Sequence, residues 1–392
     1  MKIALACPAS LPATQFGGIL FLCVDIAREL AKIGHDVTIY TTDLDSANNA
    51  KTFNKKLPRL ENIDGFKINR THAWFYFNLF YVNPGMYSQL KKDRPDIIHT
   101  VGIRSFQSII AALVSKECKI PLVISDQGGL TTHPDLETNS LIKKILYRFQ
   151  IPFIKFIINQ ATKISVPNEY EKKIFTKFNA ESKVSIIQNG INLDSFHTTI
   201  DFKGKYKINN DFILFVGRFN KVKGVDVLLK AWSLIKNSKE IGNTKLVIMG
   251  VDFGFESEMF NMINELEIKD SVFVIKKPPR EDVIAAYQDC KFLVLPSRWE
   301  LSPLTPLEGF AFKKPVISTT AHGIPYTIQD KENAILVDPE DHRQLSDAIL
   351  KLISDEKIRT AYGLAGYKLV QETCNSTNMA RNTLKIYKEI VE

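Results

Sequence analysis

Two loops in the second half of the chain carry side chains that suit an anionic ligand. Glu300 and Glu308 lie in the run WELSPLTPLEGF, which directly follows the apolar run FLVLPS (292–297). The pattern places Glu300 in a strand-to-helix loop and Glu308 about one turn into the next helix. That helix begins near Leu304 and Thr305, where unpaired backbone N–H groups favour an anion such as a phosphate. The arrangement suits a nucleotide-sugar, with a diphosphate in the middle and hydroxyl groups at both ends.

Glu308 also has a purely structural interpretation. Thr305, Pro306 and Glu308 have the spacing of a capping box, with Thr at the N-cap, Pro at the first helical position and Glu at the third. The sequence alone leaves both interpretations open. Glu300 has no such structural alternative.

Two cations follow an earlier strand of the same half. In FVGRFNKVKG, Arg218 and Lys223 lie between the strand FILFVG and a helix that begins near Gly224. A guanidinium offers a planar fork to phosphate oxygens and an ammonium offers a compact charge, so the two could neutralise a departing diphosphate. The alternative is that these side chains are simply solvated. The spacing matches neither GxGxxG nor GxxxxGK[ST], so the sequence gives no support for a dehydrogenase fingerprint or a P-loop.

The first half offers weaker candidates. Gly17 and Gly18 follow the first strand and open a helix, where a glycine pair lets the backbone approach a ligand. A loop without function is the alternative. Asp43 and Asp45 form a D-x-D pattern, but two carboxylates are a poor ligand set for a metal. We interpret them as part of a solvated loop and expect no metal site.

Further polar residues follow two other strands of the first half. His99 ends the strand DIIHTV, and Asp126 and Gln127 follow PLVISD, with His133 a few residues later. At the carboxyl edge of a parallel sheet these residues would line an acceptor-side site. A histidine that is hydrogen-bonded within the core is the alternative for His99.

The elements that must position these residues alternate between strand and helix almost from end to end. This alternation is typical of doubly wound parallel α/β sheets. Residues 194–211 are polar and lack a sustained period, so we place a domain boundary there. We expect domains at 1–195 and 196–370, each Rossmann-like, facing each other across a cleft, and a C-terminal helical segment, 371–392, that crosses back to the first domain.

The strands expected in the first half are 2–7, 36–42, 66–71, 96–101, 121–126, 163–168 and 184–190, with helices at 18–33 and 105–117. The strands expected in the second half are 212–218, 245–250, 272–277, 292–297, 315–320 and 334–338. The helices expected there are 224–236, 256–267, 281–290, 305–313 and 341–354, followed by 376–391.

Composition narrows the class of protein. The net charge of +8 arises from 51 basic and 43 acidic residues, and no block of five like charges occurs, which argues against a nucleic-acid-binding protein. The five cysteines are scattered and never in CxxC spacing, so a reducing, cytoplasmic environment is expected. The N-terminal MKIALAC favours a buried first strand over a signal peptide, and no stretch of eighteen apolar residues predicts a membrane span.

Taken together, these motifs resemble a family. The chain resembles the retaining glycosyltransferases of the GT-B fold, family 4 (glycosyl transferases group 1), over nearly its whole length. The segments that carry the resemblance are GG…ARELAKIGHDVTIYT (17–41), PDIIHTVG (95–102), VSIIQNGINLDSF (184–196), FVGRFNKVKG (215–224), E-x7-E from Glu300 to Glu308, and KKPVISTTAHGIPYTI (313–328).

The resemblance implies roles for individual residues. Arg218 and Lys223 would bind the donor diphosphate and stabilise its departure, Glu300 would contact the transferred sugar, and Glu308 would contact the ribose. The remaining donor contacts that it implies are two backbone amides of the second domain and two glycines of the first: Leu304, Thr305, Gly17 and Gly18. The resemblance also implies a retaining, metal-independent transfer with no cofactor beyond the nucleotide-diphosphate sugar.

This chain departs from the family pattern at three positions. Gln127 stands where many relatives have histidine, Tyr326 where glutamate is frequent, and Pro303 where glycine is common. We expect donor binding to survive these changes. The contact usually made after the fifth strand is placed in doubt.

Two segments bear on the acceptor, for which a glycan or a lipid-linked glycan is expected. Residues 141–163 contain five Lys or Arg and no acid, with Lys143, Lys144, Arg148 and Lys155 on one side of a helix and Ile145, Leu146, Phe149, Phe153 and Phe156 on the other. Such a helix could lie on an anionic membrane surface, or simply pack on its own sheet with a break at Pro152. Residues 74–81 hold six aromatics that form either core or an exposed lip.

Rival functions remain open at this level. A non-hydrolysing nucleotide-sugar epimerase of similar fold would need acid and base groups in the first domain. A non-catalytic nucleotide-sugar-binding protein would keep Arg218 and Lys223 yet show no turnover.

Overall fold

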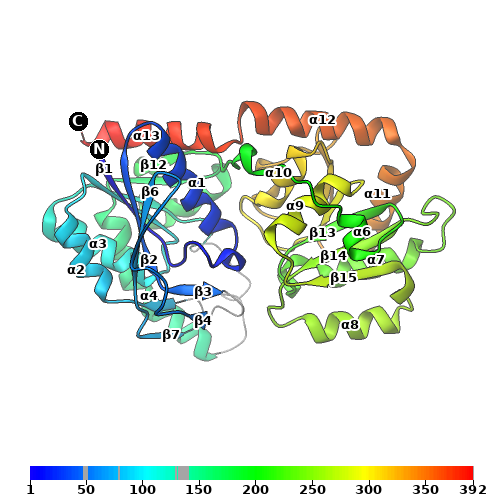
Figure 1. The fold of residues 1–392 in the computed structure, drawn as a ribbon, viewed down its shortest axis with the longest axis horizontal. Coiled ribbons are helices and arrows are strands. Elements are labelled where there is room, and N and C mark those ends of the chain that lie inside the picture. The colour runs from blue at the N-terminus through cyan, green and yellow to red at the C-terminus, as the bar shows by residue number, and fades with distance from the viewer. Residues whose placement is uncertain (47–51, 78–79, 129, 131–140, 392) are drawn as a thin grey trace. The chain divides into compact units, whose positions relative to one another are not determined.

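The computed structural model describes residues 1–46, 52–77, 80–128, 130 and 141–391 (Figure 1). The chain forms two compact units. Unit 1 comprises Met1–Gly190 together with Ser376–Glu392, and unit 2 comprises Ile191–Asn375. The sequence placed the boundary between residues 195 and 196, five residues beyond the position that the structure gives.

Unit 1 is built on a sheet of order β12-β11-β10-β9-β1-β2-β6-β5. All neighbouring strands are parallel except β5 and β6. The two halves of the sheet diverge between β1 and β9, which is the topological switch point of a doubly wound fold. The strands are β1 (Lys2–Ala6), β2 (Asp36–Thr42), β5 (Leu60–Ile63), β6 (Phe66–Thr71), β9 (Ile97–Val101), β10 (Leu122–Ser125), β11 (Lys163–Val166) and β12 (Val184–Ile186).

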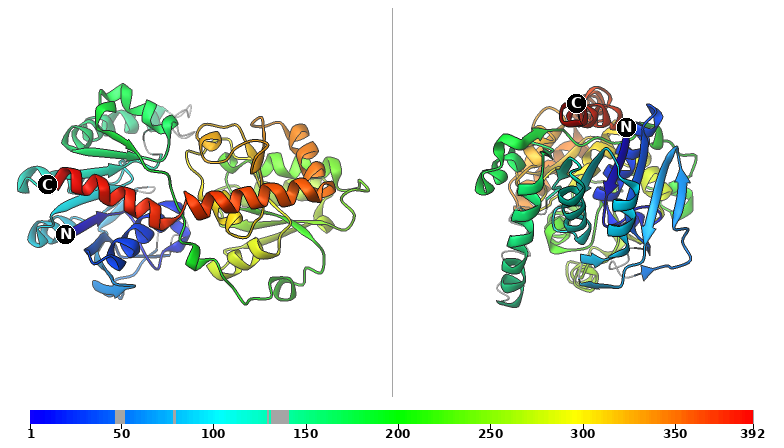
Figure 2. Two further views of the ribbon diagram at one scale, coloured as in Figure 1. Left: turned by 90° about the horizontal axis from the view of Figure 1, so that it is seen from above. Right: turned by 90° about the vertical axis from the view of Figure 1, so that its left-hand side faces the viewer.

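Helices cover this sheet because its strands are buried on both faces, as runs such as IIHTV and LVIS require. The helices are α1 (Gly18–Lys32), α2 (Gly85–Asp93), α3 (Phe106–Cys118), α4 (Leu141–Gln160), α5 (Glu169–Ile174) and α13 (Ser376–Val391). The C-terminal α13 packs along α1, where Thr377 Oγ1 donates to Glu29 Oε2 at 2.9 Å (Figure 2). The last helix of the chain therefore completes unit 1.

Three short antiparallel pairings were absent from the sequence prediction. β5 pairs with β6 across a two-residue turn whose residues Asp64 and Gly65 have φ of 49° and 87°, the backbone that such a hairpin needs. β3 (Leu44–Ser46) pairs with β4 (Thr52–Phe53), and β7 (Phe75–Phe77) pairs with β8 (Phe80–Val82). All three pairings fall within residues 44–82 of the chain.

Unit 2 has a six-stranded parallel sheet of order β15-β14-β13-β16-β17-β18. Counted within the unit this is 3-2-1-4-5-6, the order of a dinucleotide-binding fold, with its switch point between β13 and β16. The strands are β13 (Phe212–Val216), β14 (Lys245–Gly250), β15 (Val272–Lys276), β16 (Leu293–Leu295), β17 (Val316–Thr319) and β18 (Ala334–Val337). Ile191 N donates to Cys374 O at 3.1 Å, so the two ends of unit 2 lie side by side.

The helices of unit 2 are α6 (Phe202–Tyr206), α7 (Val225–Ile235), α8 (Glu256–Glu265), α9 (Arg280–Asp289), α10 (Leu304–Ala311), α11 (His342–Ser354) and α12 (Glu356–Glu372). The sequence analysis assigned no helix to 356–372, which contains two glycines. Both glycines are buried where a side chain would collide: an added Cβ would lie 2.0 Å from Lys313 O at Gly363 and 2.2 Å from Phe310 Cδ1 at Gly366. They allow α12 to pack closely on α10.

The fold class predicted from the sequence is confirmed, since both units are α/β with parallel sheets. The five cysteines are all free thiols. None of the helices in the described part of the chain combines the length and the apolar composition that a membrane span requires.

Candidate functional site

The candidate residues of unit 2 meet at the switch point of its sheet. Arg218 follows β13 and Glu300 follows β16, and these two strands are neighbours in the sheet. The carboxyl ends of parallel strands at such a point form the crevice in which α/β domains bind ligands. Arg218 and Glu300 are 82 residues apart in the sequence, and the pairing of β13 with β16 brings their loops to the same edge of the sheet.

A glycine brings Lys223 to this crevice. Residues Lys221–Lys223 form a 3-10 turn, and Asn220 caps it by accepting a hydrogen bond from Lys223 N at 3.1 Å. Gly224 then has φ 69°, and a Cβ there would lie 1.9 Å from Pro296 O. Only glycine lets this turn press against the end of β16.

The Lys223 ammonium consequently contacts the Glu300 carboxylate directly. Their side chains are 20% and 16% exposed, so the pair is partly shielded from water yet reachable by a ligand. Ser297 Oγ also donates to Glu300 Oε1 at 3.3 Å, and Gly323 N donates to Glu300 O at 3.0 Å. Glu300 is therefore held by both its side chain and its backbone.

Arg218 is positioned by the loop that follows β14. Phe219 N donates to Val251 O at 2.8 Å, and an added Cβ at Gly250 would lie 1.8 Å from Gly217 O, so the two loops pack tightly. The Arg218 guanidinium lies over the ring of Phe253, with 5.1 Å from Cζ to the ring centroid. Stacking of a guanidinium on an aromatic face is compatible with hydrogen bonds from its edge N–H groups to oxygen atoms.

The capping interpretation of Glu308 is wrong. Helix α10 begins at Leu304 with Pro303 at its N-cap and no side-chain cap, so Thr305 is already inside the helix. Among the hydrogen bonds of the described residues, none is donated by the amides of Leu304 or Thr305, as expected for a first helical turn. Those amides are where the sequence predicted a phosphate.

The Glu308 carboxylate instead turns toward α9. Its Oε1 accepts from Arg280 Nη2 at 2.7 Å, and its Oε2 accepts from Tyr287 OH at 2.6 Å. Burial, together with the negative charge of Glu308, raises the pKa of Tyr287 well above its ordinary value. Each carboxylate oxygen retains a further lone pair, which could accept a hydrogen bond from a ribose hydroxyl.

Arg298 joins the two loops and was missed in the sequence analysis. Its guanidinium forms a bidentate pair with Asp226, with both N–O distances at 2.7 Å. Its backbone N donates to Val222 O at 2.8 Å, and its Nε donates to Glu340 Oε1 at 2.9 Å. Arg298 thus ties the Lys221–Lys223 turn to the loop of Glu300. Its position two residues before Glu300 was the only available signal.

The candidates of unit 1 lie at carboxyl ends of its strands. Gly17 is the N-cap of α1, with φ 104°, and a Cβ added there would meet no atom within 4 Å. Gly18 is exposed at the first helical position. The open space beside Gly17 is compatible with close approach of a ligand, and φ 104° explains the glycine by itself.

His99 is part of the core of unit 1. It is 1% exposed, its Nδ1 lies 2.6 Å from Tyr387 OH, and its Nε2 lies 2.7 Å from Ser125 Oγ. Burial lowers the pKa of His99 to about 3, so the imidazole is neutral at physiological pH. This geometry favours the structural interpretation of His99. His133 lies outside the described residues.

Gln127 and Asp126 form an ordered, strained loop after β10. Gln127 has φ 51°, and its amide exchanges two hydrogen bonds of 3.0 Å with the amide of Asn189. Asp126 is fully buried beside Glu171. The sequence analysis missed Glu171, which lies in the first turn of α5, a helix capped by Asn168. Burial, then the charge of Asp126, raises the pKa of Glu171 well above its ordinary value.

The interpretation of Asp43 and Asp45 as a solvated loop is wrong. Asp43 is 5% exposed, and its carboxylate binds His72 Nδ1 at 2.5 Å and Ala73 N at 3.1 Å. Asp45 lies in strand β3 and accepts from Asn54 Nδ2 at 2.8 Å. In the described part of the chain, no group of three or more His, Cys, Asp or Glu residues is arranged to hold a metal ion.

Comparisons with known proteins identify the family. The profile described as "Glycosyltransferase Family 4" matches residues 16–195, and the profile described as "Glycosyl transferases group 1" matches 197–369. An uncharacterised glycosyltransferase of Methanocaldococcus jannaschii is 25% identical over 415 aligned positions, covering 100% of this chain and 99% of that protein.

Solved structures show the same fold. Sucrose-phosphate synthase from Thermosynechococcus elongatus superposes with a TM-score of 0.78 at 18% identity, over 100% of this chain and 99% of that one. HepE of Anabaena, in complex with UDP, superposes with a TM-score of 0.77 at 16% identity over 100% of both chains. The chain therefore belongs to the family 4 glycosyltransferases with the GT-B fold, and its general activity is glycosyl transfer.

Proposed function

We propose that the protein transfers a hexose-type sugar from a nucleotide-diphosphate sugar to a glycan or lipid-linked acceptor, with retention of the anomeric configuration. One observation carries the donor assignment: Arg218, Lys223, Glu300 and the start of α10 are brought to a single switch point of unit 2. The complex of HepE with UDP supports the same class of ligand by analogy of fold.

The chemistry follows from charge. The diphosphate would lie at the amides of Leu304 and Thr305, and Arg218 and Lys223 would offset the negative charge that develops as it leaves. Two fixed cations can supply this neutralisation without a divalent metal. Lys223 already contacts Glu300, so a phosphate oxygen would share the ammonium while Glu300 accepts a hydroxyl of the sugar.

Retention requires no protein base in this proposal. The oxygen of the leaving phosphate accepts the acceptor's hydroxyl proton on the face from which the phosphate departs. The acceptor oxygen then forms its bond to the anomeric carbon on that same face. The protein contributes orientation and electrostatic stabilisation.

A panel of donors tests this function. The purified protein is incubated with UDP-, GDP- and ADP-sugars with and without glycan acceptors, and nucleoside diphosphate release and the product anomer are followed by NMR. Transfer with retained configuration is expected with one donor. Interconversion of the donor sugar alone would indicate the epimerase, and binding without any turnover would indicate a non-catalytic sensor.

We also propose that α4 binds the cytoplasmic surface of a membrane. Phe149 is 71% exposed, Phe153 is 52% exposed, and Ile151 is 43% exposed, and the basic Arg148 and Lys155 lie exposed among them. Apolar side chains flanked by cations favour the surface of an anionic bilayer. Co-sedimentation with vesicles should require anionic lipid and should be lost on replacing Phe149 and Phe153 by serine. Equal binding to neutral vesicles would contradict this part.

A further inference from the structure

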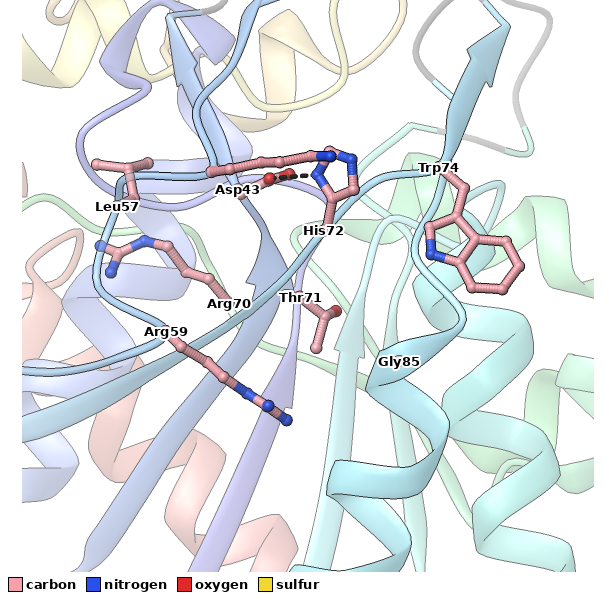
Figure 3. Close-up of a pocket in the computed structure, with 9 residues that line it drawn as sticks. Asp43, Leu57, Arg59, Arg70, Thr71, His72, Trp74 and Gly85 are labelled. Atoms are coloured by element: carbon pink, nitrogen blue, oxygen red, sulfur yellow. Dashed lines mark hydrogen bonds and ion pairs between the residues drawn. The ribbon is translucent and has the colours of Figure 1, made fainter.

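A pocket of about 480 Å³ lies in unit 1, and Asp43 and His72 are part of its lining (Figure 3). Its lining includes Lys55, Leu57, Arg59, Arg70, His72 and Trp74. Asp43 and His72 directly follow β2 and β6, two adjacent parallel strands, so the pocket lies at the carboxyl edge of the sheet. Its volume falls within the range of about 300–1,000 Å³ that small-molecule sites occupy.

Arg70 orders the part of the chain that carries Arg59. The Arg70 guanidinium is buried, with Nη1 donating to Pro58 O and Nη2 donating to Leu11 O, both at 2.9 Å. Its backbone N donates to Arg59 O at 2.7 Å. Arg70 therefore fixes the segment that carries Arg59 at the rim.

The acids near the pocket are already engaged. Both oxygens of Asp43 are used, by His72 Nδ1 at 2.5 Å and by Ala73 N at 3.1 Å. Glu61 pairs with Arg70 at 2.6 Å. By contrast, the side chains of Lys55 and Arg59 have no ion-pair partner among the described residues, and the Nε of Arg70 is buried without a hydrogen-bond acceptor there. The pocket thus has cationic groups in excess.

An aromatic wall stands opposite these cations. In Figure 3 the indole of Trp74 lies on one side of the pocket and Arg59 on the other, while the Arg70 side chain points away from Trp74. Trp74 is 72% exposed although its backbone is fixed by a 2.8 Å hydrogen bond from Trp74 N to Val82 O. A large exposed apolar ring on an ordered backbone offers a contact surface to a ligand with an apolar face and a polar rim.

We propose that this pocket binds an acidic sugar of the acceptor, a unit that carries a carboxylate or a phosphate. Arg59 and Lys55 contact the anion, and Trp74 packs against the apolar face of the sugar ring. The inference rests on the proposed glycosyl transfer, since an acceptor-binding role presupposes an acceptor. It adds the chemical class of that acceptor, which the switch point of unit 2 does not specify.

Calorimetric titration of the full chain with three probes tests the proposal. The probes are methyl glucuronide, glucose 6-phosphate and the neutral methyl glucoside. One acidic sugar should bind at least roughly 10-fold more tightly than the glucoside, because a charge-assisted contact is made only by the acid. The acid that binds distinguishes a carboxylate from a phosphate ligand.

Three variants make the test specific, and two of them, Arg59→Ala and Lys56→Ala, remove the same charge. Arg59→Ala should weaken binding of the preferred acid roughly 10-fold, and Trp74→Ala should weaken the acid and the glucoside together. Lys56→Ala removes an exposed cation next to Lys55 that does not line the pocket, and it should leave the affinities unchanged. Equal affinity for all three sugars, no measurable binding, or equal effects of Arg59→Ala and Lys56→Ala would overturn the proposal.

A parallel titration of the wild-type protein with nucleoside diphosphates separates the two proposals. Nucleotide binding without preference for an acidic sugar would reject the pocket and keep the donor site. Preference for an acidic sugar that depends on Arg59, without nucleotide binding, would reject the proposed transfer and keep the pocket as an acidic-sugar site.

Discussion

The carboxyl edges of the two sheets differ in the charge state of their buried polar residues. In unit 2, opposite charges face each other across the switch point, as Lys223 does with Glu300 and Arg298 with Asp226. In unit 1, the corresponding residues are buried: His99 on β9 has a lowered pKa, and Asp126, which follows β10, lies beside Glu171, whose pKa is raised. Paired charges can be exchanged for those of a charged ligand, whereas a buried group such as His99 holds neighbouring side chains in place.

This difference bears on which residues would bind the donor and which would bind the acceptor. In the proposed function, the carboxyl edge of unit 2 at Arg218, Lys223 and Glu300, here called the donor edge, would bind the diphosphate. In unit 1 the cations lie away from the switch point, in the pocket of Arg59 and Trp74. If both proposals hold, acceptor selection and leaving-group stabilisation depend on residues of different units.

The largest expected effect comes from removing the cation of the donor edge. Lys223→Ala should lower kcat roughly 100- to 1,000-fold, because charge stabilisation of the leaving group is lost. Lys221→Ala, two residues away and paired with the exposed Glu258, is the matched control and should retain activity. Steady-state kinetics with the preferred donor measure both, and similar rates for the two variants would contradict the comparison.

A second effect concerns stability, through the ion pair of Arg298 with Asp226. Arg298→Ala should reduce the free energy of unfolding by about 2 kcal/mol, since a charged hydrogen-bonded pair is broken and Asp226 is left half-buried. Arg343→Ala, an exposed arginine on α11, should change it by less than about 0.5 kcal/mol. Denaturant unfolding measures both variants.

The same pair predicts a pH dependence. Burial opposes ionisation of Asp226, but the hydrogen bonds and charge of Arg298 outweigh it and lower the pKa of Asp226. A lowered pKa in the folded state stabilises the protein above the ordinary aspartate pKa and is lost as pH falls below about 4. The difference between wild type and Arg298→Ala should therefore shrink below that pH, and a constant difference down to acid pH would count against the ion pair.

His99 gives the corresponding test in unit 1. Its pKa of about 3 in the folded state lies below the ordinary value, so the unfolded chain binds a proton that the folded chain does not. Stability from this group should fall as pH drops below about 6.5, by up to roughly 1.4 kcal/mol per pH unit. The imidazole resonances of His99 should stay unchanged from pH 7.5 to 5, and a midpoint near 6.5 would show that the core is solvated.

The smallest effect is expected at Glu308. Glu308→Gln should weaken nucleotide affinity only about fivefold, because one hydrogen bond to a ribose hydroxyl is weakened while Tyr287 retains an acceptor. Glu281→Gln, on the exposed side of α9, controls for the loss of a carboxylate. Identical affinities for the two variants would remove Glu308 from the donor site.

The sequence predicted the alternating architecture well because buried parallel strands are continuous apolar runs, as in FILFV and KLVIMG. It failed where tertiary contacts override local pattern. Gly363 and Gly366 sit inside α12 because α10 approaches closely, which no local rule indicates. The edge strand Leu60–Ile63 is too short and too polar to stand out.

The candidate site divides in the same way. Arg218, Lys223 and Glu300 could be selected because residue type and position after a strand coincide. Arg298 and Glu171 could not, because their significance comes from partners far along the chain, Asp226 and Asp126. Asp43 was misjudged for the same reason, since its partner His72 comes from a different strand.

The most direct test of the donor edge is the affinity of nucleoside diphosphates for the wild-type protein and for the double variant Arg218→Ala, Lys223→Ala. Isothermal titration with UDP, GDP and ADP should find one that binds the wild-type protein. Its affinity should fall roughly 100-fold in the double variant, because two charge-assisted contacts to the phosphates are lost. Unchanged affinity in the double variant would contradict the claim that the diphosphate binds at the switch point of unit 2.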